Sequence, residues 1–399
     1  MKNFIILIML AANLVGCKSN EWPPVPEPPV AQSPGIWKKG LERSGLTSTP
    51  LYYQDNILFG HHAKETNNYL VYCLNAKTVD SVWQTRIVTP FEFNPFDGQM
   101  SFLSNDKLVL SDSKRMFVLN AMSGEILWNY TDPNNFGGVC IIDNNIYIAE
   151  AVLRETSTMY RFDINTGVKE KLFTINRSEY GSNYSPDVLM PVKWVHPSGD
   201  EILVLQNRTY GWFTDMESKM VILAWNLTAD SMLWYRDRLD GFSSQARPAI
   251  VGDKVYFYGD HHTYCINPAT GETIWKYFIG NGPEDDFNTA NILIIEDKVI
   301  IKPDNEHIHA VNKETGERIW VNEKTEASPG LLTVHKDTIW FASAGIFGIN
   351  ANTGEKVIDD WNNGGYGSWI FPVAHHPTNG TIFTSDATGF YCLNPKYMK

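Results

Sequence analysis

The sequence predicts an all-β fold, an eight-bladed β-propeller of four-stranded blades whose last blade is completed by the N-terminal strand. Three observations predict it. One unit of about 40–45 residues recurs along the chain, which is the repeat length of a propeller blade. Each copy holds four short alternating apolar runs, and the chain stops in the middle of its last copy. Helical periodicity is nearly absent, so the repeat region is predicted to be β-structure throughout.

The copies align on an Asn or Asp that ends an apolar run and is termed the marker residue. The eight markers are Asn75, Asn120, Asp163, Asn226, Asn267, Asn312, Asn350 and Asn394. Successive markers lie 45, 43, 63, 41, 45, 38 and 44 residues apart. Five copies follow the marker with Thr-Gly or Ser-Gly, and five place a tryptophan eight residues after it. The third and seventh copies lack that tryptophan, so the pattern is degenerate there.

Copy five shows how one unit becomes four strands. Its runs at 249–251, 254–259, 263–267 and 273–278 are short, β-branched and aromatic, with turns rich in Asn, Asp and Gly between them. The glycine of Thr-Gly can take the left-handed conformation that a tight hairpin with a bulge requires. A single blade cannot bury both of its faces, so neighbouring blades must stack and the ring must close. Tryptophan on the outermost strand supplies a large flat group for the layer between blades.

Ring closure is predicted from the two ends of the chain. The last copy stops at 391–399, YCLNPKYMK, before its tryptophan strand. Residues 36–39, IWKK, match IWKY at 274–277 but have no copy ahead of them. Trp37 is therefore predicted to be the missing tryptophan of copy eight. The N-terminal strand would then complete the last blade and leave no open edge.

The N-terminus predicts an exported, lipid-anchored protein. Residues 1–16 hold one lysine and an apolar run too short to span a bilayer, and Cys17 follows Leu-Val-Gly. This pattern resembles a lipoprotein signal peptide with lipid on Cys17, and the alternative is an ordinary secretory signal. Residues 17–34 carry six prolines and are predicted to be an extended linker ahead of the propeller at 35–399. Lys18 favours the outer membrane and leaves the leaflet, periplasmic or cell-surface, open.

Charge and cysteine use weigh against two classes of partner. The formal net charge of −12 repels phosphate backbones, so no nucleic acid is expected. Cys73, Cys265 and Cys392 stand at equivalent positions of three copies, where they are too far apart to bridge. We expect them, with Cys140, to be small buried hydrophobes. No Cys-x-x-Cys or Cys-x-x-His spacing predicts a metal site.

Three histidine pairs remain as candidates for metal binding or acid–base chemistry. They are His61-His62, His261-His262 and His375-His376. The pairs fall at unlike positions of copies one, five and eight, and adjacent residues of a strand point to opposite faces of the sheet. We therefore expect turn and blade-interface histidines and no metal site.

The repeats CINPATGETIW (265–275) and AVNKETGERIW (310–320) resemble the quinoprotein-type, PQQ-like propeller repeat. The resemblance covers 36–399. Eight such blades behind a lipid-attachment cysteine are most similar to the lipoprotein family of the outer-membrane barrel-assembly machinery. The resemblance implies a propeller fold, whereas function must be argued from the site.

The resemblance also raises an enzymatic alternative. Enzymes of the family stack a quinone on a tryptophan, in many members beneath a ring formed by two adjacent cysteines, and they bind Ca²⁺ through acidic and amide side chains. This chain has no adjacent cysteine pair and lacks the long insertions that build a pocket above the ring. We therefore expect no cofactor and no enzymatic activity, with a quinone-dependent dehydrogenase as the least favoured alternative.

Long aromatic segments are the candidate binding surface. Segments 86–100, 130–138, 174–191, 207–220 and 361–372 fall between blades or between second and third strands, which share one face of a propeller. The predicted partner-binding residues are Phe91, Phe93, Phe96, Tyr210, Trp212, Phe213, Tyr366 and Trp369. Exposed aromatic clusters mark interfaces, and the alternative is that these loops fold inward and plug the channel.

The leading functional prediction is a lipid-anchored propeller scaffold in the outer membrane that binds another envelope protein. Outer-membrane protein assembly, with a β-barrel assembly component as the partner, is the candidate process. The alternative from another class is a surface propeller that binds a glycan or small ligand, because aromatic side chains beside Asn and Asp serve sugars equally well.

Overall fold

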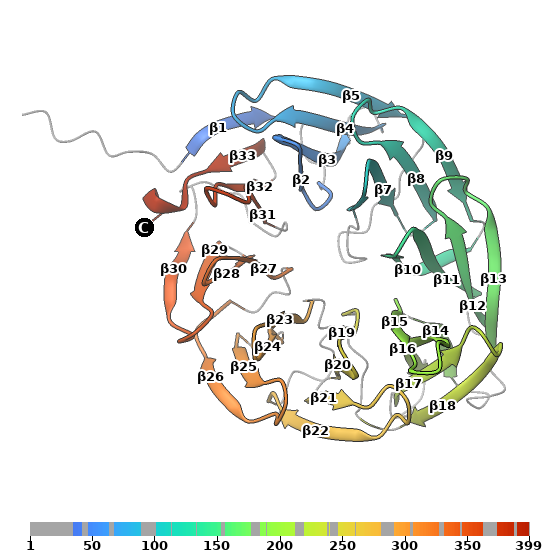
Figure 1. Ribbon diagram of the computed structural model, residues 1–399. Helices are drawn as coiled ribbons and strands as arrows, with labels where there is room; N and C mark the ends of the chain where they lie inside the picture. The colour runs from blue at the N-terminus through green and yellow to red at the C-terminus, as the bar shows by residue number, and fades with distance from the viewer. Residues whose placement is uncertain are drawn as a thin grey trace, which may run out of the picture.

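The computed structural model forms a ring of eight antiparallel sheets, seven of four strands and one of five, which confirms the eight-bladed propeller (Figure 1). Within the first seven blades the strands follow one another outward from the centre of the ring. The eighth blade has the order β31-β32-β33-β1, so that the N-terminal strand β1 is its outermost strand. The predicted closure of the last blade is therefore confirmed.

The structure describes residues 35–41, 47–63, 68–88, 101–112, 114–132, 134–152, 156–176, 184–188, 190–211, 219–237, 239, 246–259, 261–280, 291–303, 306–326, 331–343, 345–361, 373–386 and 389–398. Within these ranges, no helix has the length and apolar character needed to cross a bilayer. The predicted signal peptide at 1–16, Cys17 and the linker at 17–34 lie outside them.

Blades 1 to 4 contain β2 (Leu51–Tyr53), β3 (Asn56–Ala63), β4 (Asn68–Asn75) and β5 (Ser81–Ile87); β6 (Ser101–Ser104), β7 (Lys107–Ser111), β8 (Arg115–Asn120) and β9 (Ile126–Thr131); β10 (Asn135–Ile142), β11 (Asn145–Val152), β12 (Thr156–Asp163) and β13 (Lys169–Asn176); and β14 (Tyr184–Val188), β15 (Val192–Val195), β16 (Glu201–Gly211), β17 (Lys219–Asn226) and β18 (Ser231–Asp237).

Blades 5 to 8 contain β19 (Ala249–Val251), β20 (Lys254–Tyr258), β21 (His262–Ile266) and β22 (Thr273–Phe278); β23 (Leu293–Ile295), β24 (Lys298–Ile301), β25 (Ile308–Asn312) and β26 (Arg318–Asn322); β27 (Thr333–His335), β28 (Thr338–Ala342), β29 (Ile346–Asn350) and β30 (Lys356–Trp361); and β31 (Ala374–His375), β32 (Ile382–Asp386), β33 (Gly389–Leu393) and β1 (Gly35–Gly40). A 3-10 helix, η2 (Pro395–Tyr397), follows β33.

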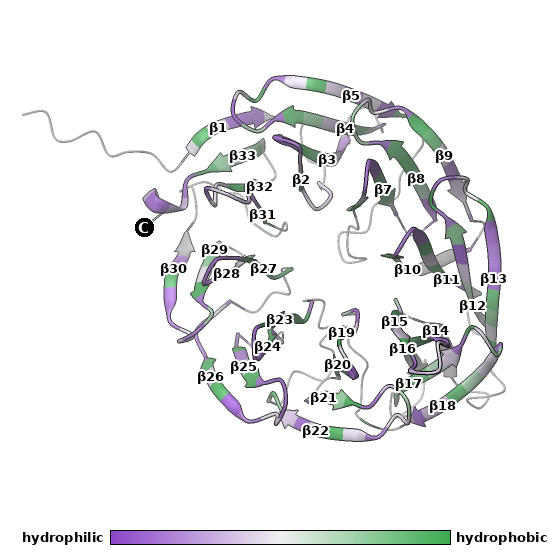
Figure 2. Ribbon diagram, viewed as in Figure 1, coloured by the Kyte–Doolittle hydropathy of each residue, from purple (hydrophilic) through white to green (hydrophobic). Residues whose placement is uncertain are grey.

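Burial explains the two kinds of strand. Middle strands are buried on both faces, as in β4, because a blade packs against a neighbour on each side. Outermost strands such as β9 alternate between exposed and half-buried residues because one of their faces meets solvent. Figure 2 shows hydrophobic residues along β7 and β8 and a mixture along β5 and β13. The core is therefore a set of layers between blades.

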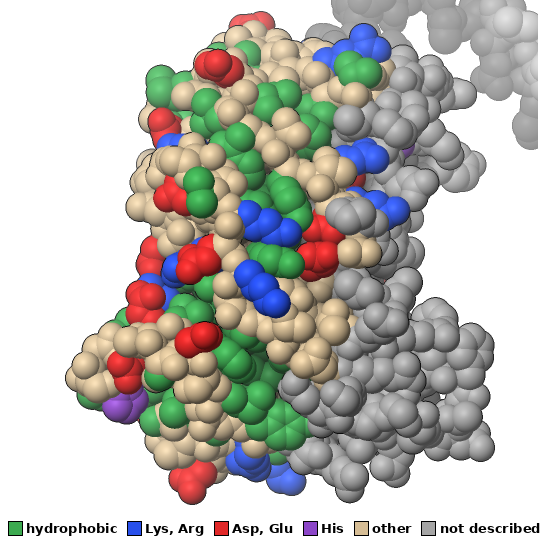
Figure 3. All heavy atoms as spheres, turned by 90° about the vertical axis from the view of Figure 1, so that its right-hand side faces the viewer, with side chains coloured by type: hydrophobic (Ala, Val, Ile, Leu, Met, Phe, Trp, Pro, Cys, Tyr) green, Lys and Arg blue, Asp and Glu red, His purple; other side chains and the backbone are tan. Residues whose placement is uncertain are grey.

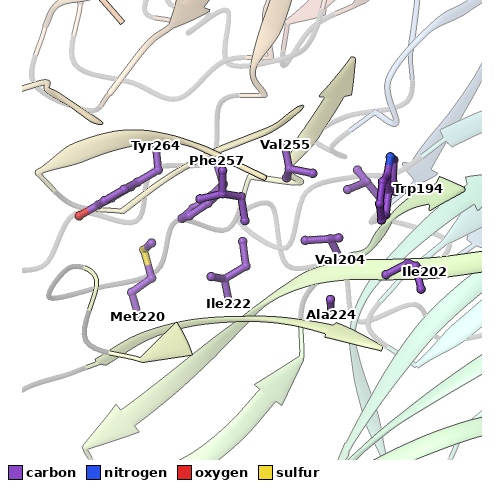
Figure 4. Packing of buried hydrophobic residues seen from close by; sticks show 11 residues of the cluster. Trp194, Ile202, Val204, Met220, Ile222, Ala224, Val255, Phe257 and Tyr264 are labelled. Atoms are coloured by element: carbon purple, nitrogen blue, oxygen red, sulfur yellow. The ribbon is translucent and has the colours of Figure 1, made fainter. Parts of the chain in front are cut away.

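The layer between blades 4 and 5 shows this packing. Ile222 and Val204 from β17 and β16 face Phe257 and Val255 of β20 across the layer (Figure 4). The Trp194 indole N–H donates to the Asp253 carboxylate of the next blade at 3.1 Å. Side chains of adjacent blades thus share one apolar layer, and no blade has a separate core.

The marker residue fixes the turn between the third and fourth strands. The Asn120 side-chain oxygen accepts hydrogen bonds from the backbone N–H groups of Met122 and Ser123 at 2.9 and 3.0 Å. Its carbonyl accepts from Gly124, which has φ +73°. Asn or Asp is favoured there because its short side chain can bond the backbone two and three residues on.

Blade 4 departs from the regular repeat and accounts for the 63-residue spacing. Its second strand β16 continues to Gly211, and β14 pairs with this extension, as Ser185 does with Tyr210. Parts of the segments predicted as loops at 174–191 and 207–220 are therefore strands. Met220 is fully buried in the layer between blades 4 and 5 and belongs to the core.

The four cysteines of the propeller are free and buried, as expected. Burial raises the pKa of the Cys73, Cys265 and Cys392 thiols to about 12 and that of Cys140 to about 11. These thiols stay protonated near neutral pH and pack as small apolar groups.

Candidate interaction surface

Six tryptophans join neighbouring blades in one repeated contact, termed a seam. At each seam a tryptophan on the outermost strand of one blade donates its indole N–H to the carbonyl that follows the marker of the next blade. The pairs and N···O distances are Trp37–Ala76 3.0 Å, Trp83–Ala121 3.1 Å, Trp128–Ile164 2.9 Å, Trp234–Pro268 2.7 Å, Trp275–Lys313 3.0 Å and Trp320–Ala351 3.1 Å. Buried Trp N–H groups need such partners.

The glycine that follows the marker in five copies has a second role that sequence reasoning missed. A β-carbon built at Gly124 would lie 2.4 Å from the Trp83 ring, and one at Gly316 would lie 2.7 Å from the Trp275 ring. Glycine is therefore needed for its left-handed backbone and also because the neighbouring blade's indole occupies the β-carbon position. The recurring pairing of Gly in one copy with Trp in the preceding copy could have revealed this contact.

Trp37 closes the ring as predicted. β1 pairs antiparallel with β33, with Trp37 opposite Cys392, and the Trp37 indole donates to Ala76 of blade 1. Its ring lies 6.1 and 6.2 Å from the rings of Phe383 and Phe390. The N-terminal strand thus supplies both a sheet edge and a regular tryptophan seam.

Most of the predicted partner-binding residues lie outside the described residues: Phe91, Phe93, Phe96, Trp212, Phe213, Tyr366 and Trp369. Tyr210 is the exception, in the extended part of β16. The strand ends on either side of these segments are described. β5 and β30 end as fourth strands and β16 ends as a second strand. In an antiparallel blade those ends point the same way, so the three segments depart from one face of the ring.

The segment at 130–138 is different, because its described aromatic residue packs within the molecule. The Lys169 Nζ lies 3.7 Å from the Tyr160 ring centroid and 4.6 Å from that of Tyr130, within reach of a cation–π contact. Its ammonium is 3.8 Å from both the Asp132 and Glu150 carboxylates. Burial and the hydrogen bond to Asp132 raise the pKa of Tyr130. Tyr130, which lies in β9, therefore packs within the molecule.

The histidine pairs are spread over the ring, and the pair in blade 8 contacts both neighbouring blades. His375 Nε2 lies 3.0 Å from the Thr333 hydroxyl, and the His375 and His335 rings are stacked 5.7 Å apart. His376 Nε2 lies 3.1 Å from the Tyr52 hydroxyl of the first blade. Burial, with His335 nearby, lowers the pKa of His375 to about 4. Among the described residues no group of three or more His, Cys, Asp or Glu side chains could hold a metal ion.

The described residues also do not fit the quinone and calcium that enzymes with this repeat carry. The four described cysteines are buried separately, in four different blades, so they cannot form the ring of two adjacent cysteines. The described carboxylates form no cluster suited to a calcium ion. We therefore derive no chemical step through such a group.

Comparison with known proteins identifies relatives of this ring. A family model described as outer membrane protein assembly factor BamB matches residues 67–360. No curated protein sequence matches the chain significantly.

Three solved structures share the fold. A europium-containing methanol dehydrogenase has a TM-score of 0.65 at 11% identity, covering 90% of this chain and 86% of that one. The quinohemoprotein alcohol dehydrogenase from Comamonas testosteroni has 0.59 at 10%, covering 90% and 76%. The computationally designed Ika8 protein has 0.62 at 12%, covering 89% and 98%. At these identities the likeness concerns the fold alone.

Proposed function

Because the chain belongs to the family of the outer membrane protein assembly factor BamB, we propose that it is a propeller scaffold that binds another envelope protein during outer-membrane protein assembly. Lipid on Cys17 would anchor it to the outer membrane, and residues 17–34 would hold the ring away from the lipid surface. The family match over 67–360 carries the proposal, because that range reaches from the first blade into the seventh.

The geometry supports a binding role. Six tryptophan seams make the ring a stiff platform, and the long aromatic segments depart from one of its faces. Rigid platforms that present aromatic side chains lose little conformational entropy on binding. We place the partner on the face that carries 86–100, 207–220 and 361–372.

Crosslinking in intact envelopes followed by purification of the full chain tests this placement. The Phe91, Phe93 and Phe96 alanine set, or Trp212→Ala with Phe213→Ala, should remove the crosslinked partner while leaving the unfolding midpoint almost unchanged. Interface anchors typically contribute about 2 kcal/mol or more each to binding. Tyr366→Ala with Trp369→Ala tests the third segment in the same way.

A matched control lies on the opposite face. Met122 and Val168 are exposed apolar residues in the turns after two markers. Met122→Ala and Val168→Ala should leave partner capture unchanged. Unfolding of the aromatic variants, with capture following only the folded fraction, would mean that the aromatic segments plug the channel and that the placement is wrong.

The anchor and the absence of enzymatic activity are tested separately. Cys17→Ser should abolish lipid labelling and release the chain from membranes after a high-salt wash. The purified chain should show no quinone absorbance and no dye reduction with alcohols or sugars after addition of quinone and Ca²⁺. Restored dye reduction would support a dehydrogenase instead of a scaffold.

A further inference from the structure

The outermost strand at the seam between blades 3 and 4 contains no tryptophan, and it also has a different register. In β9, Ile126 pairs with Leu119 and Trp128 pairs with Val118, so one residue is skipped just before the tryptophan. In β13 the skipped residue comes later, after Lys171, and Glu170 pairs with Arg161. Arg161, like Val118, lies two residues before its marker, so Glu170 occupies the register position of the seam tryptophans. A bulge changes the direction of the side chains next to it. Because the bulge in β13 lies later in the strand than in β9, different side chains face blade 4.

This change leaves a hollow in the ring. A cavity of about 380 Å³ opens between blades 3 and 4. Its walls include Arg161, Glu170, Lys171, Leu172, Leu227 and Asp230. Deeper in the seam, Phe173 stacks on Trp225 with ring centroids 4.6 Å apart, so the blades still meet there. Only the outer part of the layer, where other seams place an indole, is open.

The other seam without a tryptophan is filled. Between blades 7 and 8, Ile358 takes the tryptophan position opposite Gly348. Met398, from the C-terminal end, is 1% exposed and packs in one apolar cluster with Ile358 and Trp340. The seam between blades 3 and 4 thus differs from the other seven, which hold an indole or an apolar substitute.

We propose that the cavity between blades 3 and 4 is a docking site for a tryptophan side chain on an extended segment of another protein. The equivalent position at six other seams holds an indole. In each case the indole N–H donates to the carbonyl after the marker. In blade 4 that carbonyl belongs to Leu227, which lines the cavity. No indole from blade 3 reaches it, because β13 carries Glu170 and Lys171.

Part of the wall, which also carries Glu201 and Thr228, can contact an indole. Leu172 and Leu227 offer apolar surface, and the Arg161 guanidinium can lie against an aromatic face, as arginines do in cation–π contacts. Arg161 is held by Glu170, with N···O distances of 2.6 and 3.0 Å. The cavity walls carry both basic and acidic side chains, and charges of both signs lie on the side of the ring that carries β13 (Figure 3). These charges can orient a polar peptide backbone around the inserted ring.

An extended segment also has a strand to pair with. β13 is the outermost strand of its blade, and among the described strands it pairs with β12 alone, so no described strand covers its other edge. A peptide can add to such an edge through backbone hydrogen bonds while one side chain enters a pocket. The cavity and the open edge together define a partner of one kind, a β-strand segment with a tryptophan.

The β-carbon of Asp230 does not prevent this docking. Asp230 has φ 49° and stands where five other copies have glycine. Val79 stands at the same position in blade 1 with φ 62°, and Trp37 still donates to Ala76 at 3.0 Å beside it. An indole can therefore fit next to a side chain at this turn position.

The site is separate from the aromatic face proposed above. Leu227 and Asp230 lie in the turn between third and fourth strands, which belongs to the face opposite the aromatic segments. The inference therefore goes beyond the proposed function, and either can fail without the other.

The test uses the full chain and a peptide copied from its own β22, an acetylated and amidated TIWKY (residues 273–277), with TIAKY as the control. Titration by NMR or calorimetry should show that TIWKY binds at least tenfold more tightly than TIAKY. Glu170→Trp fills the cavity from within and should weaken TIWKY binding at least tenfold. Ile358→Trp, at the seam that is already filled, is the matched control and should leave binding unchanged.

Two outcomes of the titrations would overturn the proposal: equal binding of the two peptides, or TIWKY binding that Glu170→Trp does not change. A photoreactive TIWKY on the unmodified chain keeps the test independent of variant folding. Its label should map by mass spectrometry to 161–172 or 227–230. Labelling elsewhere would contradict the site.

Discussion

The ring has two kinds of seam, and comparing them shows what holds the blades together. At the six tryptophan seams, an indole of one blade, a backbone carbonyl and, in most cases, a glycine of the next form one unit. At the seams that follow blades 3 and 7, Glu170 and Ile358 stand in the register position of the indole. The repeated sequence motif therefore describes a contact between copies more than a feature within one copy.

The glycines make the same point. Asp230 in copy four and Met398 in copy eight stand four residues after their markers, at the glycine position, and each follows a copy without tryptophan. Where no indole arrives, glycine is not required. Val79 in copy one is the exception, since Trp37 still docks there. A tryptophan seam thus favours glycine strongly without depending on it.

The largest expected effect concerns the seam that closes the ring. Deleting 18–40 removes β1, leaves β33 with an open edge and takes away the Trp37 indole. We expect destabilisation above about 5 kcal/mol, since a buried tryptophan alone contributes roughly 3–5 kcal/mol. Deleting 18–34 is the control and should leave the unfolding midpoint almost unchanged. Similar urea unfolding curves for the two deletions would show that β1 is not needed for closure.

The next prediction compares the loss of stability on truncating the residue at the seam-tryptophan position in blade 6, Trp320, and in blade 3, Glu170. Trp320 is 8% exposed, and its indole bonds the Ala351 carbonyl. Trp320→Ala should lower the free energy of unfolding by about 3–5 kcal/mol, because it leaves a cavity and a carbonyl without its donor. Glu170→Ala should cost less than about 1 kcal/mol, because an exposed ion pair with Arg161 contributes little. Equal losses in urea unfolding would mean that the two seams are alike.

The sequence predicted the ring, its closure and the tryptophans between blades. It did not predict the glycine that most of the indoles contact or the register change in β13. The markers, the spacing and the match between IWKK and IWKY were enough to place Trp37, because a closed ring allows no spare strand. The role of Gly316 against Trp275 was missed, since it depends on a contact between residues of different copies. The register change in β13 was also missed, because the spacing from Asp163 to Lys171 is unchanged and only the skipped residue moves.

Aromatic content was a weaker guide than repetition. The segment 130–138 was one of the candidate binding segments, and its described Tyr130 lies in β9 and packs against Lys169. A tyrosine near the end of an outermost strand reads the same in sequence whether its ring points outward or contacts a lysine. The remaining aromatic residues on the proposed face stay predictions for the crosslinking experiment.

The third prediction concerns pH at one seam of each kind. Burial lowers the pKa of His309 to about 4, with His307 and Arg318 adding to the effect, at the tryptophan seam between blades 5 and 6. His375 is shifted to a similar value at the seam between blades 7 and 8. Both histidines are held neutral in the folded state, so the unfolded chain binds protons first as the pH falls. The stability contributed by these two histidines should be complete above about pH 6.5, decrease towards pH 4 and change little below that.

Each pKa unit corresponds to about 1.4 kcal/mol, so each histidine should contribute on the order of 2–3 kcal/mol to the loss. Urea unfolding at pH 7, 5.5 and 4.5 measures it. His309→Gln and His375→Gln should each remove part of the pH dependence. If only His375→Gln does so, protonation acts at the seam without tryptophan alone.

The smallest expected effect separates the two roles of the glycine. Gly316 and Gly252 both have left-handed backbones, with φ +73° and +58°. A β-carbon at Gly316 would lie 2.7 Å from the Trp275 ring, whereas one at Gly252 meets nothing within 4 Å. Gly252→Ala should cost about 1–2 kcal/mol from backbone strain alone. Gly316→Ala should cost about 1–3 kcal/mol more, because the indole must shift in a packed layer.

Urea unfolding of both variants measures the difference. Trp275→Phe serves as a background in which the smaller ring relieves the clash. A Gly316→Ala penalty equal to that of Gly252→Ala would show that the ring can move away freely, and the indole would then not be what requires glycine at the seams.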